Sequence, residues 1–172
     1  YLGTFSKSIA PSLRISYMVL PLHLLKKYQE SCSFYSTTVS KIQQEVLREF
    51  IRGGYFGRHL NKMRGIYKNK HDFLVGELKK KNWVQNIAGD NAGLHVLVQV
   101  NTTLTEEEIC KKAAECGIRL MGIREHYIHT PPEGRPVLLL GYGKPDEQEI
   151  QKGLEVLESI ITGRNSNNCK KP

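Results

Sequence analysis

The chain has 172 residues, of which 40% are hydrophobic and 24% are charged, and its formal net charge is +8. These proportions are typical of a globular protein. No apolar run approaches the roughly 20 residues that cross a bilayer, and no signal peptide is visible, so we expect no membrane segment. The four cysteines lack the spacing of metal ligands and are too few for a disulfide scaffold, so we expect no metal site.

The positive net charge has two interpretations. It could mark a module that binds nucleic acid. However, the lysines and arginines are spread along the predicted helices, with short runs only at residues 79–81 and 170–171. This distribution favours solvated helix surfaces, and we keep the nucleic-acid module as the weaker alternative.

The first 21 residues predict two short strands joined by a hydroxyl-rich loop. The loop carries Lys7 and breaks at Pro11, and Arg14 leads into the second strand. Seven residues of extended chain span roughly 23 Å, too far for Lys7 and Arg14 to hold one small molecule. A turn at Pro11-Ser12 lets the chain fold back, so we expect the two cations to converge.

The residue types in this loop suit a phosphorylated aldehyde. A lysine amine can form a Schiff base with an aldehyde. A guanidinium binds phosphate through two parallel hydrogen bonds, and Thr4, Ser6 and Ser8 add hydroxyl donors. Pyridoxal 5'-phosphate fits this description, although a lysine in a polar loop is more often simply solvated.

Residues 3–17, with the sequence GTFSKSIAPSLRISY, resemble the cofactor-lysine segment of fold-type-I aminotransferases. They are most similar to the aminotransferase-like domain of MocR-type regulators in the GntR superfamily. The resemblance implies that Lys7 carries the cofactor as an internal aldimine and that Arg14 holds its phosphate, with Thr4 and Ser6 also at the cofactor. Ser16 departs from the glycine that many relatives have there.

Two helices are predicted to follow a short helix near residues 23–28 and a hydroxyl-rich connection. The first covers about 38–53, and the second, about 56–81, spans roughly 39 Å. Residues 58–67, RHLNKMRGIY, resemble the start of the interdomain helix of MocR-type domains. In the resembled family, the connection reaches the partner subunit's cofactor pocket, for which Tyr35 and Ser36 are candidates, with helix capping as the equal alternative.

Strands and helices alternate in the remainder of the chain. We predict strands at residues 94–100, 118–121 and 137–142, a helix that begins at the capping box 105–108, and a helix from Pro145 to Gly163. Residues 87–93 read as a turn-rich break. The pattern predicts a small sheet with helices on one face. His59 and His95 are more simply explained as structural than as catalytic or ligand-binding residues.

The fold class is therefore expected to be α/β, of the fold-type-I aminotransferase kind. The predicted divisions are the end of a large cofactor-binding domain at 1–37, interdomain helices at 38–82, a small α+β domain at 83–163 and a disordered tail at 164–172. We expect further residues upstream of Tyr1, including the acidic and aromatic residues that complete such a cofactor site.

An amino-acid ligand needs a guanidinium for its carboxylate. The resemblance places that arginine on the strand at 137–140, which has none. Arg124, in the long polar loop 122–135, is the preferred replacement and Arg135 the second candidate, and a solvated arginine remains the simpler interpretation of each.

The resemblance implies a domain that senses an effector by forming an external aldimine with an amino compound. It also implies a cytoplasmic homodimer that contacts DNA only through an N-terminal winged-helix domain absent from this chain. The alternative is an active aminotransferase, in which the Lys7 amine moves the Cα proton of an amino acid. Transamination is possible only in the full-length protein, so whether the chain belongs to an enzyme stays open.

Overall fold

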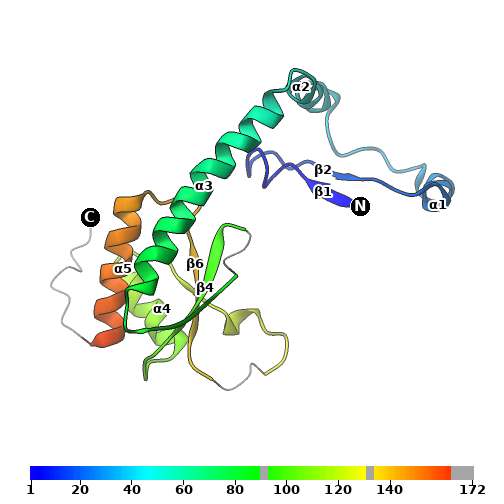
Figure 1. Cartoon of the computed structure of the whole chain (residues 1–172). Helices are drawn as coiled ribbons and strands as arrows, with labels where there is room; N and C mark the ends of the chain where they lie inside the picture. Colours follow the sequence, from blue (N-terminus) through cyan, green and yellow to red (C-terminus); the bar gives the residue numbers. More distant parts are fainter. Residues whose placement is uncertain (90–92, 131–133, 164–172) are drawn as a thin grey trace. The chain divides into compact units, whose positions relative to one another are not determined.

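We analysed a computed structural model of the chain, which describes residues 1–89, 93–130 and 134–163. Six strands, five α-helices and one 3-10 turn follow one another along the described part of the chain, and Figure 1 shows their arrangement within each part. The elements, in order, are β1 (Leu2–Thr4), β2 (Ser16–Met18), α1 (Leu22–Cys32), α2 (Lys41–Arg52), α3 (Tyr55–Lys79), β3 (Val84–Ala88), β4 (His95–Val100), α4 (Glu106–Glu115), β5 (Met121–Gly122), the 3-10 turn η1 (Arg124–His126), β6 (Val137–Gly141) and α5 (Glu147–Thr162).

The chain forms two compact units. Unit 1 comprises Tyr1–Gly65 and unit 2 comprises Ile66–Pro172, so the boundary falls within α3. The predicted division instead assigns residues 38–82 to interdomain helices. The four predicted divisions of the chain stay a prediction. The predicted disordered tail at 164–172 lies outside the described residues.

Unit 1 contains an antiparallel pair of strands and three helical segments. Strands β1 and β2 pair with Gly3 opposite Tyr17, as the strand, loop, strand interpretation predicts. A Cβ at residue 3 would lie 2.5 Å from the Tyr17 ring, which explains glycine at this position. Among the described residues of unit 1, Ile15 is the only apolar residue that is buried.

Helix boundaries in unit 1 follow the local capping chemistry. Ser40 accepts a hydrogen bond from the Gln43 amide at 3.2 Å, so α2 begins three residues later than predicted. Gly53 ends α2, as expected. Helix α1 is longer than predicted and continues to Cys32.

Unit 2 is built on a four-stranded antiparallel sheet with the order β3-β4-β6-β5. The predicted strands at 94–100 and 137–142 correspond to β4 and β6, and both are interior, since each has a neighbour on both sides. Strand β3 was missed, because the polar residues Gln85 and Asn86 and a register shift between Val84 and Asn86 obscure its alternation. The predicted strand at 118–121 is wrong in position, because the ladder with β6 begins only at Met121.

One face of this sheet is buried and the other is only partly covered. Val96, Val98 and Val100 on β4 are fully buried, and Val96 and Val98 lie opposite Leu140 and Leu138 on β6. The alternate residues of both strands are half-buried or exposed. The period of two along each strand therefore separates a core face from an outer face.

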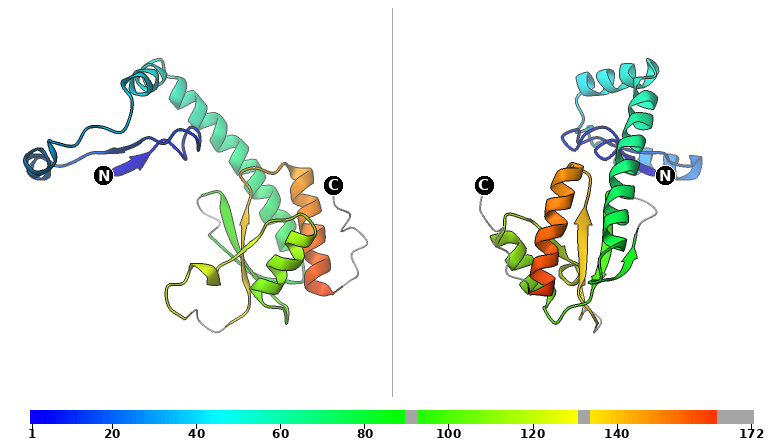
Figure 2. Two further views of the ribbon diagram at one scale, coloured as in Figure 1. Left: turned by 180° about the vertical axis from the view of Figure 1, so that it is seen from behind. Right: turned by 60° about the vertical axis from the view of Figure 1, so that its left-hand side comes forward.

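Three helices contribute side chains to the core on that face, as predicted. Helices α4 and α5 lie side by side, as both views of Figure 2 show. The C-terminal part of α3 joins them in the same cluster. The helical core residues are Leu74, Val75 and Leu78 of α3, Ile109 and Ala113 of α4, and Ile150, Leu154, Leu157, Ile160 and Ile161 of α5. Trp83 is buried just after α3 and belongs to the same cluster.

Capping boxes begin both α4 and α5. At α4, the Glu108 amide donates to Thr105 Oγ1 at 3.2 Å and the Thr105 amide donates to Glu108 Oε2 at 2.8 Å, as the sequence predicts. These hydrogen bonds from Thr105 lower the pKa of Glu108. Asp146 and Glu149 form the second box. Pro145 therefore precedes the N-cap and is not in the first turn of α5, contrary to the prediction.

A buried carboxylate joins α4 to both ends of the loop 123–136. Glu106, only 5% exposed, accepts hydrogen bonds from the backbone amides of Arg124 and Val137, both at 2.9 Å. Its Oε1 also lies 3.8 Å from Arg124 Nε. A Cβ at residue 122 would meet the Glu106 side chain, so Gly122 leaves the room that this carboxylate occupies.

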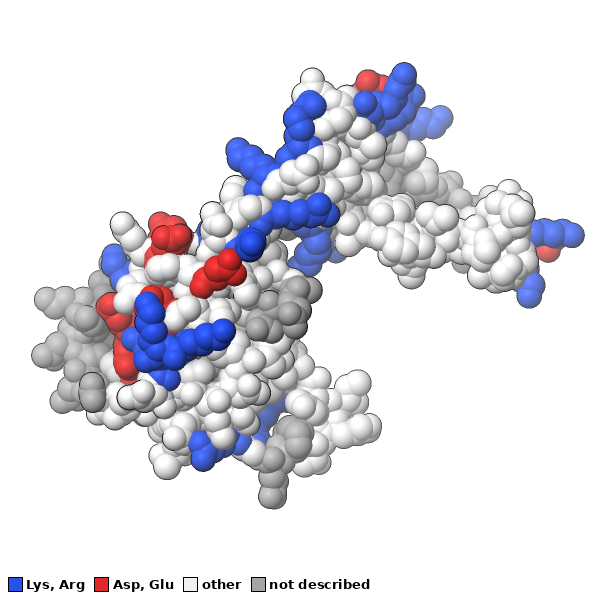
Figure 3. Space-filling model, in the orientation of Figure 1, with Lys and Arg blue, Asp and Glu red and all other residues white. Residues whose placement is uncertain are grey.

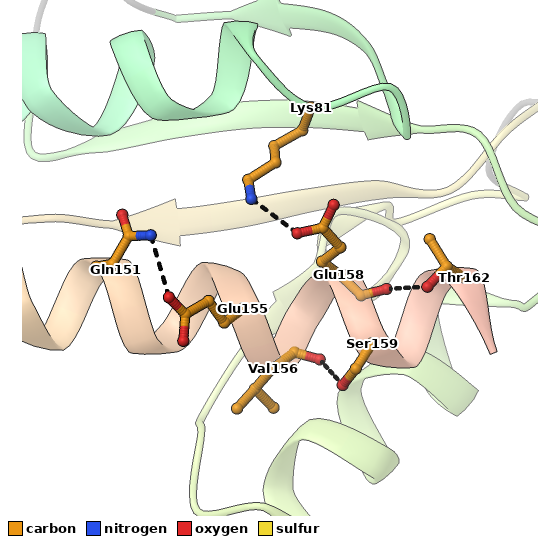
Figure 4. A network of polar contacts seen from close by, with 7 residues as sticks. All are labelled: Lys81, Gln151, Glu155, Val156, Glu158, Ser159 and Thr162. Carbon is orange, nitrogen blue, oxygen red and sulfur yellow. Dashed lines mark hydrogen bonds and ion pairs between the residues drawn. The ribbon is translucent and has the colours of Figure 1, made fainter. Parts of the chain in front are cut away.

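An ion pair connects the end of α3 to α5. Lys81 Nζ donates to Glu158 Oε2 at 2.7 Å, and the Lys81 side chain is only 16% exposed (Figure 4). On the same helix, Gln151 Nε2 donates to Glu155 Oε1 at 3.1 Å, in a more exposed pair. The partial burial of the Lys81 amine makes its interaction less screened by solvent than a surface pair.

Basic side chains are distributed over both units. On the face drawn in Figure 3, lysines and arginines form several separate groups, and acidic side chains lie among those of unit 2. This distribution agrees with solvated helix surfaces. No helix of the described ranges is both long enough and apolar enough to cross a bilayer.

We expect Glu106→Ala to lower the free energy of unfolding by roughly 2–4 kcal/mol, because two buried amides lose their acceptor. The neighbouring Glu107→Ala is the control, and the exposed Glu107 side chain predicts a change within about 0.5 kcal/mol. Urea unfolding curves of the two variants measure the difference. Equal midpoints would show that Glu106 does not brace the loop.

We expect Glu158→Gln to lower the free energy of unfolding by about 1 kcal/mol, because the Lys81 amine keeps its position but loses its ionic partner. Glu155→Gln removes a more exposed carboxylate from the same helix and serves as the matched control. Thermal unfolding followed by circular dichroism tests this, and a larger effect for Glu155→Gln would contradict it.

Candidate functional site

The loop between β1 and β2 is closed by hydrogen bonds between its two sides. The Phe5 amide donates to the Ile15 carbonyl at 2.9 Å, and Ser6 Oγ donates to the Leu13 carbonyl at 2.6 Å. At the far end, the Leu13 amide donates to the Ala10 carbonyl at 3.0 Å across Pro11 and Ser12, which forms a tight turn. The loop folds back as the turn residues predict.

This closure ties together the two sides of the loop that carry Lys7 and Arg14. Each directly follows one residue of the bonded pair Ser6 and Leu13, so the 2.6 Å bond fixes the two backbone positions together. Both side chains are exposed, and neither makes a hydrogen bond or ion pair with another described residue. The loop thus presents a free amine and a free guanidinium from its two bonded sides, a pair of groups that suits the aldehyde and phosphate of pyridoxal 5'-phosphate.

The predicted hydroxyl ligands have a second use inside the loop. Thr4 Oγ1 donates to the Ile15 carbonyl at 3.2 Å and accepts from the Ser6 amide. Ser6 is buried, and its hydroxyl donates to Leu13. A phosphate would need these hydroxyl hydrogens to change partner, so the structure fits Lys7 and Arg14 to the cofactor more directly than Thr4 and Ser6.

Aromatic side chains support the loop within unit 1. The Phe5 ring lies 5.1 Å from the Tyr17 ring and packs edge-on against Phe56 at the start of α3, with 5.9 Å between centroids. A hydrogen bond between the side chains of Tyr17 and Tyr1 raises the pKa of Tyr17, and burial adds to this rise. Tyr17 therefore stays protonated near neutral pH and acts as a packing residue.

The other candidates of unit 1 have structural surroundings. His59 lies edge-on to Phe50, in agreement with its structural interpretation. Tyr35 is exposed and packs on Phe34, and Ser36 is exposed beside it. Their predicted contact with a partner subunit stays a prediction. Ser40, from the same hydroxyl-rich stretch, caps α2.

In unit 2, the two predicted carboxylate-binding arginines line one cavity. The cavity has a volume of about 600 Å³ and lies between residues 102–107 and the two ends of the loop 123–136. Arg124 lies in the turn η1 after β5, and Arg135 lies two residues before β6. The sequence does not predict that Arg124 and Arg135 line the same cavity, because ten residues separate them.

The two arginines differ in their partners. Arg124 pairs with the buried Glu106 and donates from Nη2 to the Gly134 carbonyl at 3.2 Å. Arg135 Nη1 donates to Asn101 Oδ1, which is neutral. The cavity therefore contains one guanidinium with an ionic partner and one held only by an amide.

Sequence reasoning missed Glu106, although a signal was present. Glu106, Ile109 and Ala113 have the i, i+3, i+7 spacing of a buried helix stripe, so a carboxylate occupies an apolar position. The capping box directed attention to Glu108 instead. His95, by contrast, is exposed at the start of β4 and is not among the described residues that line this cavity.

Neither the Cys110 thiol nor the grouping of His, Cys, Asp and Glu side chains among the described residues suggests thiol or metal chemistry. Burial and the nearby carboxylates of Glu125 and Glu106 raise the pKa of Cys110, so its thiol stays protonated. Within residues 1–89, 93–130 and 134–163, no three His, Cys, Asp or Glu side chains are grouped to hold a metal ion.

Comparison with known proteins gives two kinds of relative. The family model for aminotransferase class I and II matches residues 1–152. The chain is 38% identical over 160 residues to the HTH-type transcriptional regulator YdeL of Bacillus subtilis, covering 92% of the chain and 34% of YdeL. It is 28% identical to the probable rhizopine catabolism regulatory protein MocR of Rhizobium meliloti, covering 94% of the chain and 32% of MocR. The chain thus spans about a third of these regulators.

Solved structures show the same fold. The multiple substrate aminotransferase of Thermococcus profundus superposes with a TM-score of 0.79 at 22% identity, over 95% of this chain and 40% of that one. LysN, the α-aminoadipate aminotransferase of Thermus thermophilus, gives 0.78 at 22% identity, over 95% and 41%. The predicted fold class is confirmed.

The match over residues 1–152, together with the similarity to MocR and YdeL, confirms the resemblance carried by residues 3–17 and 58–67. This chain belongs to the aminotransferase class I and II family.

Proposed function

We propose that the chain is the C-terminal part of the domain by which a MocR-type transcriptional regulator binds pyridoxal 5'-phosphate and senses an amino compound. The observation that carries the proposal is the closed loop whose two bonded sides carry the exposed Lys7 and Arg14. The similarity to YdeL and MocR supports the regulatory role over an independent metabolic one.

The two loop cations would divide the work of holding the cofactor. The Lys7 amine would carry the aldehyde end, and the planar guanidinium of Arg14 would pair with the phosphate. When bound, pyridoxal 5'-phosphate supplies an aldehyde that condenses with amines and withdraws electrons from the attached carbon. Ser6 would act by keeping the two cations at their positions through its bond to Leu13.

An effector with a carboxylate would bind in unit 2 at Arg124 or Arg135, which line one cavity. DNA contact is assigned to an N-terminal winged-helix domain outside this chain, in keeping with the HTH-type relatives. We further propose a cytoplasmic homodimer, with Tyr35 and Ser36 directed to the partner's cofactor pocket.

A second function remains a candidate because aminotransferases share both sequence and fold with this chain. The aromatic-amino-acid aminotransferase 1 of Thermococcus litoralis is 22% identical over 94% of the chain. In an enzyme, the free Lys7 amine would take up and return a proton at the Cα atom of the substrate. Steady conversion of an amino acid to its keto acid by the full-length protein distinguishes this function from sensing.

We expect Lys7→Ala in the full-length protein to abolish the visible absorbance of lysine-bound cofactor, because no other amine of the loop can replace Lys7. Lys62→Ala, which removes an exposed lysine of α3, is the control and should keep the spectrum. Retention of the absorbance in Lys7→Ala would refute the cofactor assignment.

We expect Arg14→Gln to weaken pyridoxal 5'-phosphate binding by about tenfold to a hundredfold, the usual contribution of hydrogen bonds to a charged group. Pyridoxal, which lacks the phosphate, should bind the variant and the unmodified protein equally. Fluorescence titrations with the two compounds measure this. An equal loss for both would show that Arg14 acts on the loop rather than on the phosphate.

A further inference from the structure

The positive charge of the chain is concentrated in unit 1. Residues 1–65 contain ten lysines and arginines, three glutamates and no aspartate, which gives this unit a formal charge of +7 out of the total of +8. In unit 2, by contrast, Lys80, Lys81 and Arg124 each pair with a glutamate. Figure 3 shows basic side chains along α2 and the adjoining end of α3, with few acidic ones beside them. Unit 1 therefore has cations that its own carboxylates do not neutralise.

The acidic residues of α2 are both paired with one arginine. Arg48 Nη2 lies 2.8 Å from Glu45 Oε2 and 3.2 Å from Glu49 Oε1. Arg52, at the end of the same helix, and Lys62 of α3 are exposed and make no hydrogen bond or ion pair with another described residue. These two side chains thus have no partner to release before they bind an anion.

The junction between α2 and α3 holds a third cation near the end of α2. Arg58 Nη2 donates to the Gly53 carbonyl at 3.3 Å, and the Arg58 guanidinium carbon lies 4.6 Å from the centre of the Tyr55 ring. Gly53 directly follows Arg52, so the Arg58 guanidinium is anchored beside the last residue of α2. Lys62 follows Arg58 by four residues on α3, which places both on one side of that helix.

The junction cations, Arg52, Arg58 and Lys62, suit a row of phosphates. Arg58 keeps four of its five N–H donors after its bond to the neutral Gly53 carbonyl. Residues four apart on a helix are about 6 Å apart along its axis. Each strand of DNA carries one phosphate per about 3.4 Å of axis, so neighbouring junction cations can meet phosphates of one strand.

The similarity to regulators indicates which polyanion the full-length protein meets. YdeL is an HTH-type transcriptional regulator, and the proposed function includes a domain that binds DNA in the same molecule. DNA bound by one domain is held at a high effective concentration near the others, so a second contact that is weak by itself becomes populated. DNA is therefore the polyanion that the junction cations would encounter.

We propose that the junction cations bind the phosphate backbone of DNA that flanks the site read by the N-terminal domain. This contact does not depend on base sequence, because phosphates carry no sequence information. Unit 1 is then a second, electrostatic DNA contact of the regulator. The inference goes beyond the proposed function, which assigns DNA contact to the N-terminal domain, and it rests on that function for the presence of DNA.

The test measures how the affinity of the full-length protein for DNA depends on salt. The probe is a fluorescein-labelled duplex of arbitrary sequence and about 60 base pairs, followed by fluorescence anisotropy between about 50 and 250 mM KCl. We expect the triple variant Arg52→Gln, Arg58→Gln, Lys62→Gln to reduce the slope of log K against log salt by about three, roughly 0.9 for each lost phosphate contact. Its affinity at the lowest salt concentration should fall at least about tenfold.

Lys62→Ala provides a milder variant. It removes one exposed cation and should lower the slope by about one while keeping the cofactor absorbance. Replacement of Arg52 and Arg58 by lysine keeps both charges and should keep the slope, because the counterion term depends on charge. Cofactor absorbance and unfolding temperature of each variant separate a folding defect from a lost contact.

The matched control removes the same net charge from unit 2. Lys111→Gln, Arg119→Gln and Lys152→Gln together remove three exposed cations that make no ion pair with another described residue. This variant should change the slope by less than about one, since its cations contact no phosphate in the proposed complex. An equal loss in both triple variants would mean that only the total charge of the protein matters.

The proposal is overturned by that equal loss, by an unchanged slope in the junction variants, or by the same loss in the lysine and glutamine replacements. If the unmodified protein does not bind the duplex at any of these salt concentrations, this proposal and the regulatory function are both wrong. If it binds and the junction variants keep its slope, only the junction contact is wrong, and the cofactor assignment is judged separately by the spectrum of Lys7→Ala.

Discussion

The arrangement of unit 2 depends on one buried carboxylate. Glu106 accepts from the amides of Arg124 and Val137, so a single side chain on α4 holds the beginning and the end of the loop 123–136. Burying a carboxylate is costly unless its lone pairs are satisfied. Here two amides and the Arg124 guanidinium satisfy them, and the same contacts set the places of both arginines at the cavity.

Unit 1 applies a similar constraint with neutral groups. The hydroxyl of Ser6 and the carbonyl of Leu13 close the lysine loop, and Phe5 packs against Tyr17 and Phe56. A two-stranded ribbon is marginal in water without such packing. Many apolar side chains of unit 1 are exposed, including Leu22, Ile42 and Val46. The loop is thus ordered by local contacts, while most of the apolar surface of the unit has no cover among the described residues.

The local pattern of the sequence was sufficient for most elements. The Thr105 capping box, the alternation of residues 94–100 and the stripe from Ile150 to Ile161 each report an interaction between near neighbours. Strand β3 was not predicted because its pairing with β4 contains a register shift between Val84 and Asn86, and the polar residues Gln85 and Asn86 obscure the alternation of apolar side chains. The predicted helix start at Pro145 is two residues too early, because the Asp146 carboxylate caps α5, which begins at Glu147.

The sequence by itself determined the chemistry available to this protein: an amine and a guanidinium on either side of a Pro-Ser turn, and the family motifs around them. Only the tertiary structure decided how the charges are shared. Arg124 and Arg135 are alike in sequence terms, since both lie in one polar loop. Their difference arises because Glu106, eighteen residues before Arg124, folds against one guanidinium and not the other. Such long-range pairing depends on the packing of α4 against the sheet, which no local pattern encodes.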